Sequence, residues 1–318
     1  KNMHKYLIYF FFKYLGYDIK KSQVDLDSIS CKTKYEFEKW HINKRWDIVN
    51  FHYNNNDFYN DKIGGNIPDN WDELPIITKE DIQNNLKKSI SRPYREIKNY
   101  KANTSGSTGI PLYFIKDKKC HARSWAAIFN LYQIHNIYPG SKEARFYGMP
   151  EDFIGMLIEK VKDFICNRKR FVVFNLSNNK LDQFIKRFSK DQYVYIYGYT
   201  HSIFLFAEYL IKKKIILNQI CPSLKKVIIT SELCTENEKK IIELATGVNV
   251  VVEYGASECS IIAIDCEKGS LHINESNLFV ENNEKGEILI TDLFNKAMSF
   301  IRYKIGDLGN ITQSFCEC

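Results

Sequence analysis

Between residues 101 and 260, apolar and polar positions alternate in a pattern that predicts a parallel β-sheet covered by helices. Short apolar runs rich in Val, Ile, Tyr and Phe, typical of buried strands, recur at residues 112–115, 144–147, 171–174, 193–197, 227–230 and 248–254. Amphipathic stretches of helical length lie between several of them, at residues 180–188, 201–211 and 236–245. Repeated alternation of strand and helix is typical of βαβ units, so we expect an α/β nucleotide-binding core over residues 101–260.

The first hundred residues contain few strand signals. Apolar residues recur there at helical spacing, at Tyr35, Phe37, Trp40 and Ile42. Thr78 is placed to cap a further helix, with Asp81 at the third helical position. We therefore expect a helical N-terminal subdomain over residues 1–100.

Beyond residue 260 the alternation of strand and helix stops. Strand-like segments at residues 261–264, 278–281 and 287–291 follow one another, with turns at Lys268-Gly269 and Lys285-Gly286. Consecutive strands joined by turns predict a smaller antiparallel or mixed sheet, which we expect over residues 261–318.

Composition excludes several classes of protein. The 318 residues are 44% hydrophobic and 26% charged, enough for one or two cores, and the net charge is +7. Basic residues occur in mixed clusters without a nucleic-acid-binding motif, so no nucleic-acid partner is expected. The apolar run at residues 6–12 is far shorter than the roughly 20 residues that a membrane span needs. The chain starts at Lys1 without a signal-peptide pattern, so we expect a cytoplasmic protein.

A loop rich in Gly, Ser and Thr precedes the first predicted strand of the core. It consists of Thr104, Ser105, Gly106, Ser107, Thr108 and Gly109. Glycines permit a close approach of backbone N–H groups, and the hydroxyls add donors, so the loop has the groups needed to surround a polyphosphate. It lacks the Gly-Lys-Ser/Thr ending of a Walker loop. A flexible linker is the alternative interpretation.

Two distant segments favour the phosphate interpretation. An apolar strand ends in Tyr254, Gly255 and Glu258, where the aromatic ring could stack on a planar base and the carboxylate could reach Mg²⁺. A core aromatic and a surface carboxylate are the alternative there. Farther along, Asp307 follows a glycine and could accept hydrogen bonds from ribose hydroxyls, although Gly-Asp turns are common.

In order and spacing, these three segments resemble the nucleotide motifs of the adenylate-forming enzyme superfamily. The similarity is closer to its phenylacetate–CoA ligase-like branch, which includes relatives in capsular-polysaccharide biosynthesis. Residues 74–81, 229–232 and 286–293 also fit that branch, and the resemblance covers roughly residues 70–318.

The resemblance implies a two-step ligase. A carboxylic acid would attack the α-phosphate of ATP to give an acyl-adenylate, and coenzyme A would then displace AMP. An amine or a carrier-protein thiol is an alternative acceptor, and the identities of the acid and the acceptor stay open. A nucleotide-binding scaffold without turnover is the alternative from another class.

The resemblance also implies roles for individual residues. Thr104 to Gly109 would hold the β- and γ-phosphates, with Thr104 and Thr108 as catalytic residues together with Glu258, the Mg²⁺ ligand. Tyr254 would cover the adenine and Asp307 would bind the ribose. The rest of the nucleotide site would comprise Ser231, Glu232, Glu253, Gly255 and Ser257. Tyr199 and Cys259 would border the acyl pocket.

The superfamily carries a mobile C-terminal subdomain with a hinge and an adenylation lysine. The chain stops at Cys318, eleven residues past Asp307, and Lys304 does not match that lysine. We therefore expect the subdomain to be absent here, with ATP binding retained and adenylation slow.

The nine cysteines are odd in number and lack a regular spacing, which favours free thiols or metal ligands over disulfides. Cys266, His272 and the Cys316-x-Cys318 pair together form a Cys₃His set suited to tetrahedral Zn²⁺. Ordinary thiols and a surface histidine are the alternative interpretation.

Overall fold

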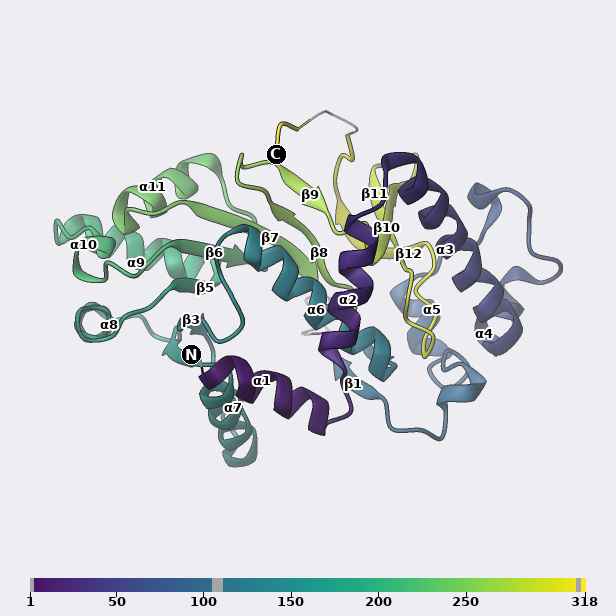
Figure 1. Cartoon of the computed structure of the whole chain (residues 1–318), viewed down its shortest axis with the longest axis horizontal. Helices are drawn as coiled ribbons and strands as arrows, with labels where there is room; N and C mark the ends of the chain where they lie inside the picture. The colour runs from purple at the N-terminus through teal and green to yellow at the C-terminus, as the bar shows by residue number, and fades with distance from the viewer. Residues whose placement is uncertain (1–2, 105–110, 313–315) are drawn as a thin grey trace.

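A seven-stranded sheet forms the centre of the computed structural model, which describes residues 3–104, 111–312 and 316–318 (Figure 1). The strand order is β4-β3-β5-β6-β7-β8-β9, parallel from β4 to β7 and antiparallel from β7 to β9. The strands are β3 (Glu143–Tyr147), β4 (Arg168–Val172), β5 (Tyr195–Tyr199), β6 (Lys226–Thr230), β7 (Val250–Ala256), β8 (Ser260–Asp265) and β9 (Leu271–Ile273). The predicted α/β fold is confirmed.

Helices cover both faces of this sheet. They are α6 (Lys118–Ile134), α7 (Phe153–Ile165), α8 (Asn178–Lys190), α9 (Thr200–Lys212), α10 (Leu217–Ile220) and α11 (Glu236–Thr246). Val227 and Val250 pack in a core with α8, α9 and α11, whereas the adjacent Ile228 and Val251 pack with Tyr132 of α6. Successive strand residues therefore face opposite layers, which is why these strands are apolar throughout.

Helices dominate the first hundred residues, as the sequence predicts. They are α1 (Met3–Tyr14), α2 (Ile19–Ser30), α3 (Lys34–Asn55), α4 (Asp57–Ile63) and α5 (Lys79–Asn84), with 3₁₀ turns η1 (Trp71–Glu73) and η2 (Arg92–Tyr94). The predicted cap of α5 is a complete capping box: Asp81 N–H donates to the Thr78 hydroxyl, and Thr78 N–H donates to the Asp81 carboxylate.

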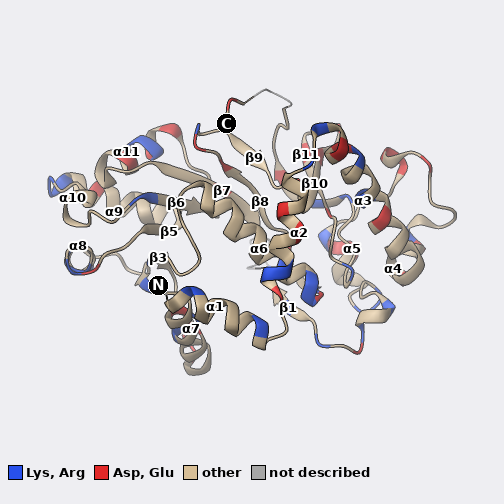
Figure 2. Cartoon of the chain, viewed as in Figure 1, with Lys and Arg blue, Asp and Glu red and all other residues tan. Residues whose placement is uncertain are grey.

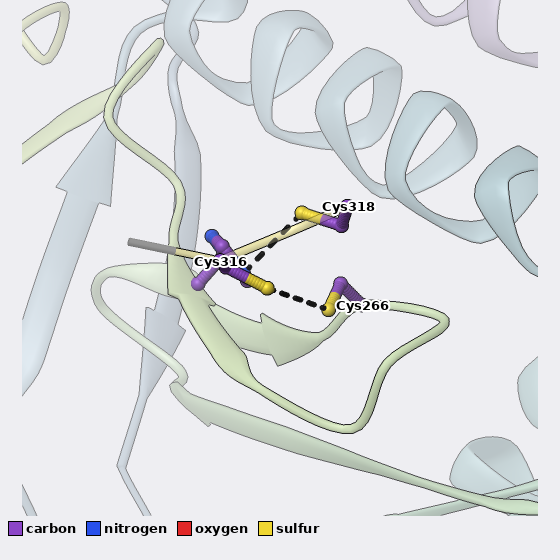
Figure 3. A group of neighbouring side chains, drawn as sticks. Cys266, Cys316 and Cys318 are labelled. Carbon is purple, nitrogen blue, oxygen red and sulfur yellow. Dashed lines mark hydrogen bonds between the residues drawn. The ribbon is translucent and has the colours of Figure 1, made fainter. Parts of the chain in front are cut away.

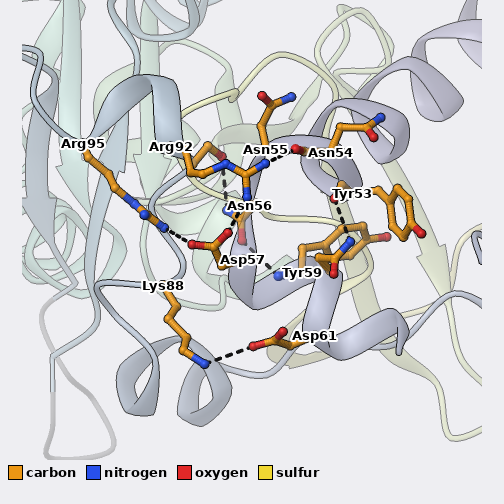
Figure 4. A network of polar contacts seen from close by, with 12 residues as sticks. Tyr53, Asn54, Asn55, Asn56, Asp57, Tyr59, Asp61, Lys88, Arg92 and Arg95 are labelled. Carbon is orange, nitrogen blue, oxygen red and sulfur yellow. Dashed lines mark hydrogen bonds and ion pairs between the residues drawn. The ribbon is translucent and has the colours of Figure 1, made fainter. Parts of the chain in front are cut away.

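A buried polar junction fixes the angle between α3 and α4 (Figure 4). The Asn56 side chain donates to the carbonyl of Ser89 at 2.7 Å and accepts from the N–H of Tyr59 at 3.0 Å. Next to it, the Asp57 carboxylate pairs with Arg92 at 2.5 Å and Arg95 at 2.6 Å. These contacts attach the segment that contains η2 to the helices.

Two smaller antiparallel sheets complete the fold. One contains β10 (Leu278–Asn282), β11 (Glu287–Asp292) and β12 (Tyr303–Leu308); the other pairs β1 (Tyr100–Asn103) with β2 (Tyr113–Lys116). The strand expected at residues 261–264 in the small sheet is instead β8 of the large sheet. The reason is a tight turn, closed by Cys259 N–H on the carbonyl of Ala256, which folds β8 back onto β7.

One apolar core joins the N-terminal helices to the C-terminal strands. It contains Ile48 of α3, Ile77, Leu112, Ile290 of β11 and Tyr303 of β12. The core crosses both expected subdomain boundaries, near residues 100 and 260, so the division into three subdomains stays a prediction.

Arg302 provides a polar link across the same core. Its guanidinium is buried and donates to the Glu281 carboxylate at 2.9 Å and to the carbonyl of Leu74 at 2.9 Å. These bonds connect the start of β12 with β10 and with the segment that follows η1.

In the part of the chain that the structure describes, none of the helices has both the length and the apolar character needed to cross a bilayer.

His52 provides a test of the α3 packing. Its ring is fully buried and contacts the Ser91 hydroxyl at 3.1 Å and the carbonyl of Asn295 at 2.9 Å, and burial lowers its pKa to about 4. The unfolded chain takes up this proton near pH 6.5, so the stability contributed by neutral His52 is lost as pH falls from 6.5 towards 4. The loss is about 2 kcal/mol by pH 5.

The free energy of unfolding, measured in urea at pH 7 and pH 5 for wild type and His52→Gln, tests this prediction. Wild type should lose about 2 kcal/mol of unfolding free energy relative to His52→Gln when the pH is lowered from 7 to 5. A difference that is the same at both pH values would show that His52 titrates normally.

Candidate functional site

The candidate site is a cleft at one edge of the large sheet. Strands β3, β5, β6 and β7 are parallel, so their carboxyl ends meet at that edge, where ligands bind in open α/β sheets. The cleft there has a volume of about 460 Å³. Its walls include residues from all three sequence motifs: Thr104, then Gly255, Ser257 and Glu258, and finally Asp307. The structure thus brings together Thr104 and Asp307, which lie about 200 residues apart in the sequence.

Tyr254 and Asp307 connect the large sheet with the three-stranded sheet; Asp307 lines the cleft, and Tyr254 is not among the lining residues. The Tyr254 hydroxyl donates to the Asp307 carboxylate at 2.7 Å, although the residues are 53 positions apart. Burial, followed by this hydrogen bond, raises the pKa of Tyr254, so the phenol stays protonated. The ring and the exposed carboxylate, predicted to contact adenine and ribose, are therefore held as one unit.

Glu258 lies at the protected end of the cleft. Its side chain is 5% exposed, and its Oε1 accepts a hydrogen bond from the Tyr303 hydroxyl at 3.1 Å. Burial and the neighbouring Glu258 carboxylate raise the pKa of Tyr303, which keeps this donor protonated. A cleft-lining carboxylate oriented by one hydrogen bond is a hard oxygen ligand of the kind that Mg²⁺ prefers. Glu258 could thus supply one carboxylate ligand to a magnesium ion.

Glu253 points behind the cleft, towards α6. Its buried carboxylate accepts from the hydroxyls of Tyr132 at 2.5 Å and Tyr197 at 3.1 Å, and burial raises its pKa. The side chain lies between the cleft and a second cavity of about 110 Å³ under α6, and it lines both. The expected contact of Glu253 with adenine stays a prediction.

A stack of tyrosines forms the wall beside the β5 end. The rings of Tyr147 and Tyr199 are 4.2 Å apart at 25°, and Tyr147 lines the cleft directly. Burial, followed by the nearby Tyr147, raises the pKa of Tyr199 to about 12. Sequence reasoning selected Tyr199 but missed Tyr147, although the end of the predicted strand at residues 144–147 pointed to it.

Ser231 and Glu232 diverge at the end of β6. Ser231 lines the cleft with a positive φ of 71°. The Glu232 carboxylate instead accepts the backbone N–H of His201 at 2.8 Å, at the start of α9. Tyr199 occupies the N-cap position of α9, and its side chain makes no capping hydrogen bond. The Glu232 carboxylate, from the loop after β6, satisfies a backbone N–H of the first turn in its place. The place of Glu232 in the nucleotide site stays a prediction.

Cys259 is not among the residues that line the described cleft, and its expected place at the acyl pocket stays a prediction. Its side chain is 3% exposed and belongs to the apolar core, because the turn after Ala256 directs it inward. Burial raises the pKa of its thiol well above the ordinary value. The residue is therefore a packing residue in this structure.

Thr104 closes the base of the glycine-rich loop. Its N–H donates to the carbonyl of Leu112, and its hydroxyl oxygen accepts from the N–H of Leu112, both at 3.0 Å. Accepting this bond leaves the hydroxyl its own proton to donate. The other predicted phosphate-binding residues, Ser105, Gly106, Ser107, Thr108 and Gly109, lie outside the described residues.

The four predicted zinc ligands come together at the β8–β9 hairpin, and Figure 3 shows the three cysteines among them. The ligand atoms of Cys266, His272, Cys316 and Cys318 all lie within 4.8 Å of one another. The sulfurs of Cys266 and Cys316 are 3.8 Å apart, and the Cys318 sulfur is 3.5 Å from Nε2 of His272. All four side chains can therefore contact one ion.

Ligand spacing provides a test of which ion would fit. Tetrahedral Zn²⁺ with Zn–S of about 2.3 Å and Zn–N of about 2.0 Å requires sulfur–sulfur separations of about 3.8 Å and sulfur–nitrogen separations of about 3.5 Å. The Cys266–Cys316 and Cys318–His272 pairs, two of the six pairs in the group, have these separations. A disulfide would require about 2.05 Å between the sulfurs. The donor set fits zinc.

The comparisons with known proteins agree with the fold. No family model matches the sequence. Protein CapK of Staphylococcus aureus is 26% identical over 298 residues, which cover 87% of this chain and 63% of CapK. Among solved structures, 2-hydroxyisobutyryl-CoA ligase in complex with 2-HIB-AMP and CoA has a TM-score of 0.66 at 17% identity, covering 87% of this chain and 70% of that one. The same ligase in the postadenylation state with 2-HIB-AMP also has a TM-score of 0.66, at 16% identity, covering 87% and 64%.

The chain therefore has the fold of the adenylate-forming acyl-CoA ligases. Its sequence is similar to CapK, and it spans 63% of the length of that relative. The resemblance stated from the motifs is confirmed.

Gly255 provides a test of the cleft geometry. A β-carbon at this position would lie 2.6 Å from the carbonyl oxygen of Ser260, which is backbone and cannot rotate away. We expect Gly255→Ala to lower the free energy of unfolding by about 1–3 kcal/mol. Gly65→Ala, where nothing lies within 4 Å of the added carbon, should change it by less than about 0.5 kcal/mol. Equal effects in urea unfolding would contradict the close approach of β7 and β8.

Proposed function

We propose that this chain carries the nucleotide and acid sites of an AMP-forming acid ligase, which activates a carboxylic acid with ATP for transfer to coenzyme A. The observation that carries the proposal is the convergence of Thr104, Glu258 and Asp307 on one cleft. Two tyrosine hydroxyls hold the two carboxylates in place. The fold shared with acyl-CoA ligases supports the same reaction class.

The proposed reaction has two steps. A carboxylate oxygen of the acid forms a bond to the α-phosphorus of ATP, the bond to the bridging oxygen breaks, and pyrophosphate leaves. The thiolate of coenzyme A then attacks the acyl carbon, and AMP leaves with the carboxylate oxygen. The first step brings two anions together, so positive charge and hydrogen-bond donors must offset their repulsion.

The residues of the cleft would divide this task. Glu258 would hold Mg²⁺, which supplies charge neutralisation on the phosphate oxygens when it is bound. Thr104 would donate its hydroxyl proton to a phosphate oxygen, Asp307 would accept from the ribose, and Tyr254 would cover the adenine. The Tyr147–Tyr199 stack would border the acid. Coenzyme A is the acceptor in this proposal; an amine or a carrier-protein thiol stays an alternative.

A role in capsular or surface polysaccharide biosynthesis, which the resemblance of the motifs implies, is part of the proposal. We propose the cytoplasm as the location, as the sequence predicts.

Magnesium-dependent ATP binding tests the role of Glu258. We expect Glu258→Gln to weaken ATP binding about tenfold when Mg²⁺ is present, about 1.4 kcal/mol, and to change it little when EDTA is added. Isothermal titration calorimetry measures both affinities. Glu208→Gln, an exposed substitution on α9, serves as the matched control. An equal loss with and without Mg²⁺ would show that Glu258 does not act through the ion.

Exchange of labelled pyrophosphate into ATP, with a panel of carboxylic acids, separates the ligase from a scaffold. If the protein is a ligase, exchange should occur only with one class of acid, and its rate should be lower in Glu258→Gln. Measured on the full-length protein, intact ATP binding without exchange for any acid would favour the nucleotide-binding scaffold.

We also propose that Cys266, His272, Cys316 and Cys318 bind one structural Zn²⁺. The two matching separations and the Cys₃His donor set support this ion. The N–H of Lys268 lies 3.4 Å from the Cys266 sulfur and would stabilise its thiolate form. The ion would fasten the C-terminal segment to the β8–β9 hairpin.

Metal analysis tests the zinc proposal. Purified protein should contain close to one zinc per chain, and Cys266→Ser should lower this content and the melting temperature. Cys31→Ser, which removes an exposed cysteine on the far N-terminal side of the sequence, should change neither. Untreated protein without zinc, as measured by inductively coupled plasma mass spectrometry, would remove the proposal.

A further inference from the structure

Two arginines line the second cavity, the space of about 110 Å³ under α6. Arg145 lies on β3 and Arg168 on the neighbouring β4, and their side chains are 18% and 10% exposed. Charged side chains normally lie at the surface, as Figure 2 shows along the outer helices α8 and α11. A guanidinium inside a protein is stable only when acceptors surround it, so the partners of these two arginines decide what the cavity can bind.

The two guanidiniums have more donors than the surrounding residues have acceptors. Nε of Arg145 donates to Oε1 of Glu143 at 2.6 Å. Nε of Arg168 lies 3.4 Å from Oε2 of Glu143, but it is a buried atom without a hydrogen bond in the described part of the chain. Each guanidinium carries five N–H donors, and among the described residues the terminal nitrogens of both donate no hydrogen bond.

The carboxylates of the cavity wall are already occupied. The second oxygen of Glu143 accepts from the Tyr195 hydroxyl at 2.7 Å. Both oxygens of Glu253 accept from tyrosine hydroxyls, those of Tyr132 and Tyr197, and burial raises the pKa of Glu253, which favours its neutral form. The polar end of the cavity therefore has unused N–H donors and two positive charges next to one committed carboxylate. A ligand that fits it must supply acceptors.

The second cavity adjoins the candidate cleft. The residues that line both spaces are Ile128, Tyr197, Glu253 and Ile261. The Arg145 guanidinium lies over the rings of Tyr147 and Tyr197, 5.1 Å and 4.8 Å from their centroids, and both residues line the cleft. A ligand in the cleft thus has a positive group directly behind this wall.

The rest of the cavity wall is mainly apolar. It includes Ile8, Phe129 and Ile137. The volume is several times that of one water molecule, which leaves room for a short aliphatic chain with a polar end. Guanidiniums bind carboxylates through two parallel hydrogen bonds, so an apolar wall with two arginines at one end is complementary to a chain that ends in a carboxylate.

We propose that Arg145 and Arg168 bind the distal carboxylate of a short dicarboxylic acid, and that this is the acid which the ligase activates. The inference rests on the proposed function: the reacting carboxylate would lie in the cleft, and the other end would pass the shared residues into the second cavity. An acid that ends in a methyl group would leave the N–H donors unpaired and would bind less tightly for that reason.

Pyrophosphate exchange with matched acids, measured on the full-length protein, tests this inference. The probes are succinate, glutarate and adipate, each compared with its monoamide and with the methyl-ended acid of the same length. At low acid concentration, we expect one dicarboxylate to support exchange about 100-fold faster than its methyl-ended match, because a site that bonds a polar group rejects the analogue without it. The monoamide, a neutral acceptor, should fall between them.

Arg168→Gln separates binding of the distal carboxylate from a structural role, because it leaves the Glu143–Arg145 pair in place. Exchange with the dicarboxylate should fall about tenfold, while exchange with the methyl-ended acid should stay as in wild type. A general folding defect would lower both equally. Arg145→Lys, which keeps the charge but loses the planar fork, should act in the same direction. Lys169→Gln removes an exposed positive charge from the same strand and should change neither rate.

Isothermal titration calorimetry of the same acids distinguishes this inference from the proposed function. If no acid supports exchange but a dicarboxylate binds to wild type and not to Arg168→Gln, the cavity binds as proposed and the ligase proposal fails. If methyl-ended acids support exchange as well as dicarboxylates do, the ligase stands and the inference is overturned. A preference for dicarboxylates that survives in both arginine variants also overturns it, and the absence of both exchange and binding overturns both proposals.

Discussion

The buried guanidinium of Arg302 is the interaction on which the geometry of the cleft depends. A charge in this position is stable only when its hydrogen bonds are satisfied, and Arg302 meets this condition with the Glu281 carboxylate and with backbone carbonyls near η1. These partners fix where β12 begins. Tyr303 follows directly and orients Glu258, and Asp307 lies four residues farther along the same strand, bonded to Tyr254. One ion pair thus sets the positions of both carboxylates in the cleft.

The large sheet supplies the other half of this arrangement. Its parallel strands end at one edge, and β7 continues through a turn into β8, so that Glu258 lies between two hydrogen-bonded strands. The apolar core that surrounds Tyr303 and Ile290 holds the small sheet against that edge. No single helix or strand therefore forms the cleft. It lies where the large, mainly parallel sheet and the small antiparallel sheet meet around a shared core.

Local patterns predicted most of the fold. The strands at residues 144–147 and 227–230 and the capping box at Thr78 depend on neighbouring residues, which are visible in a sequence. The three motifs of the cleft were found for the same reason. Long-range partners were not predictable: the role of Arg302, the inward direction of Cys259 and the membership of β8 in the large sheet depend on residues far along the chain. Helix α4 was missed because its seven residues lie in a polar stretch and bury only Phe58 and Tyr59.

The capping of α9 by Glu232 has a consequence for anion binding. The start of α9 follows β5 at the same sheet edge as the cleft, and free N–H groups at a helix start attract phosphates. Because the Glu232 carboxylate already accepts from His201 there, a negative group is present where a triphosphate would otherwise compete. In the proposed ligase, this carboxylate would disfavour phosphates at the helix start and so favour the part of the cleft that Thr104 lines.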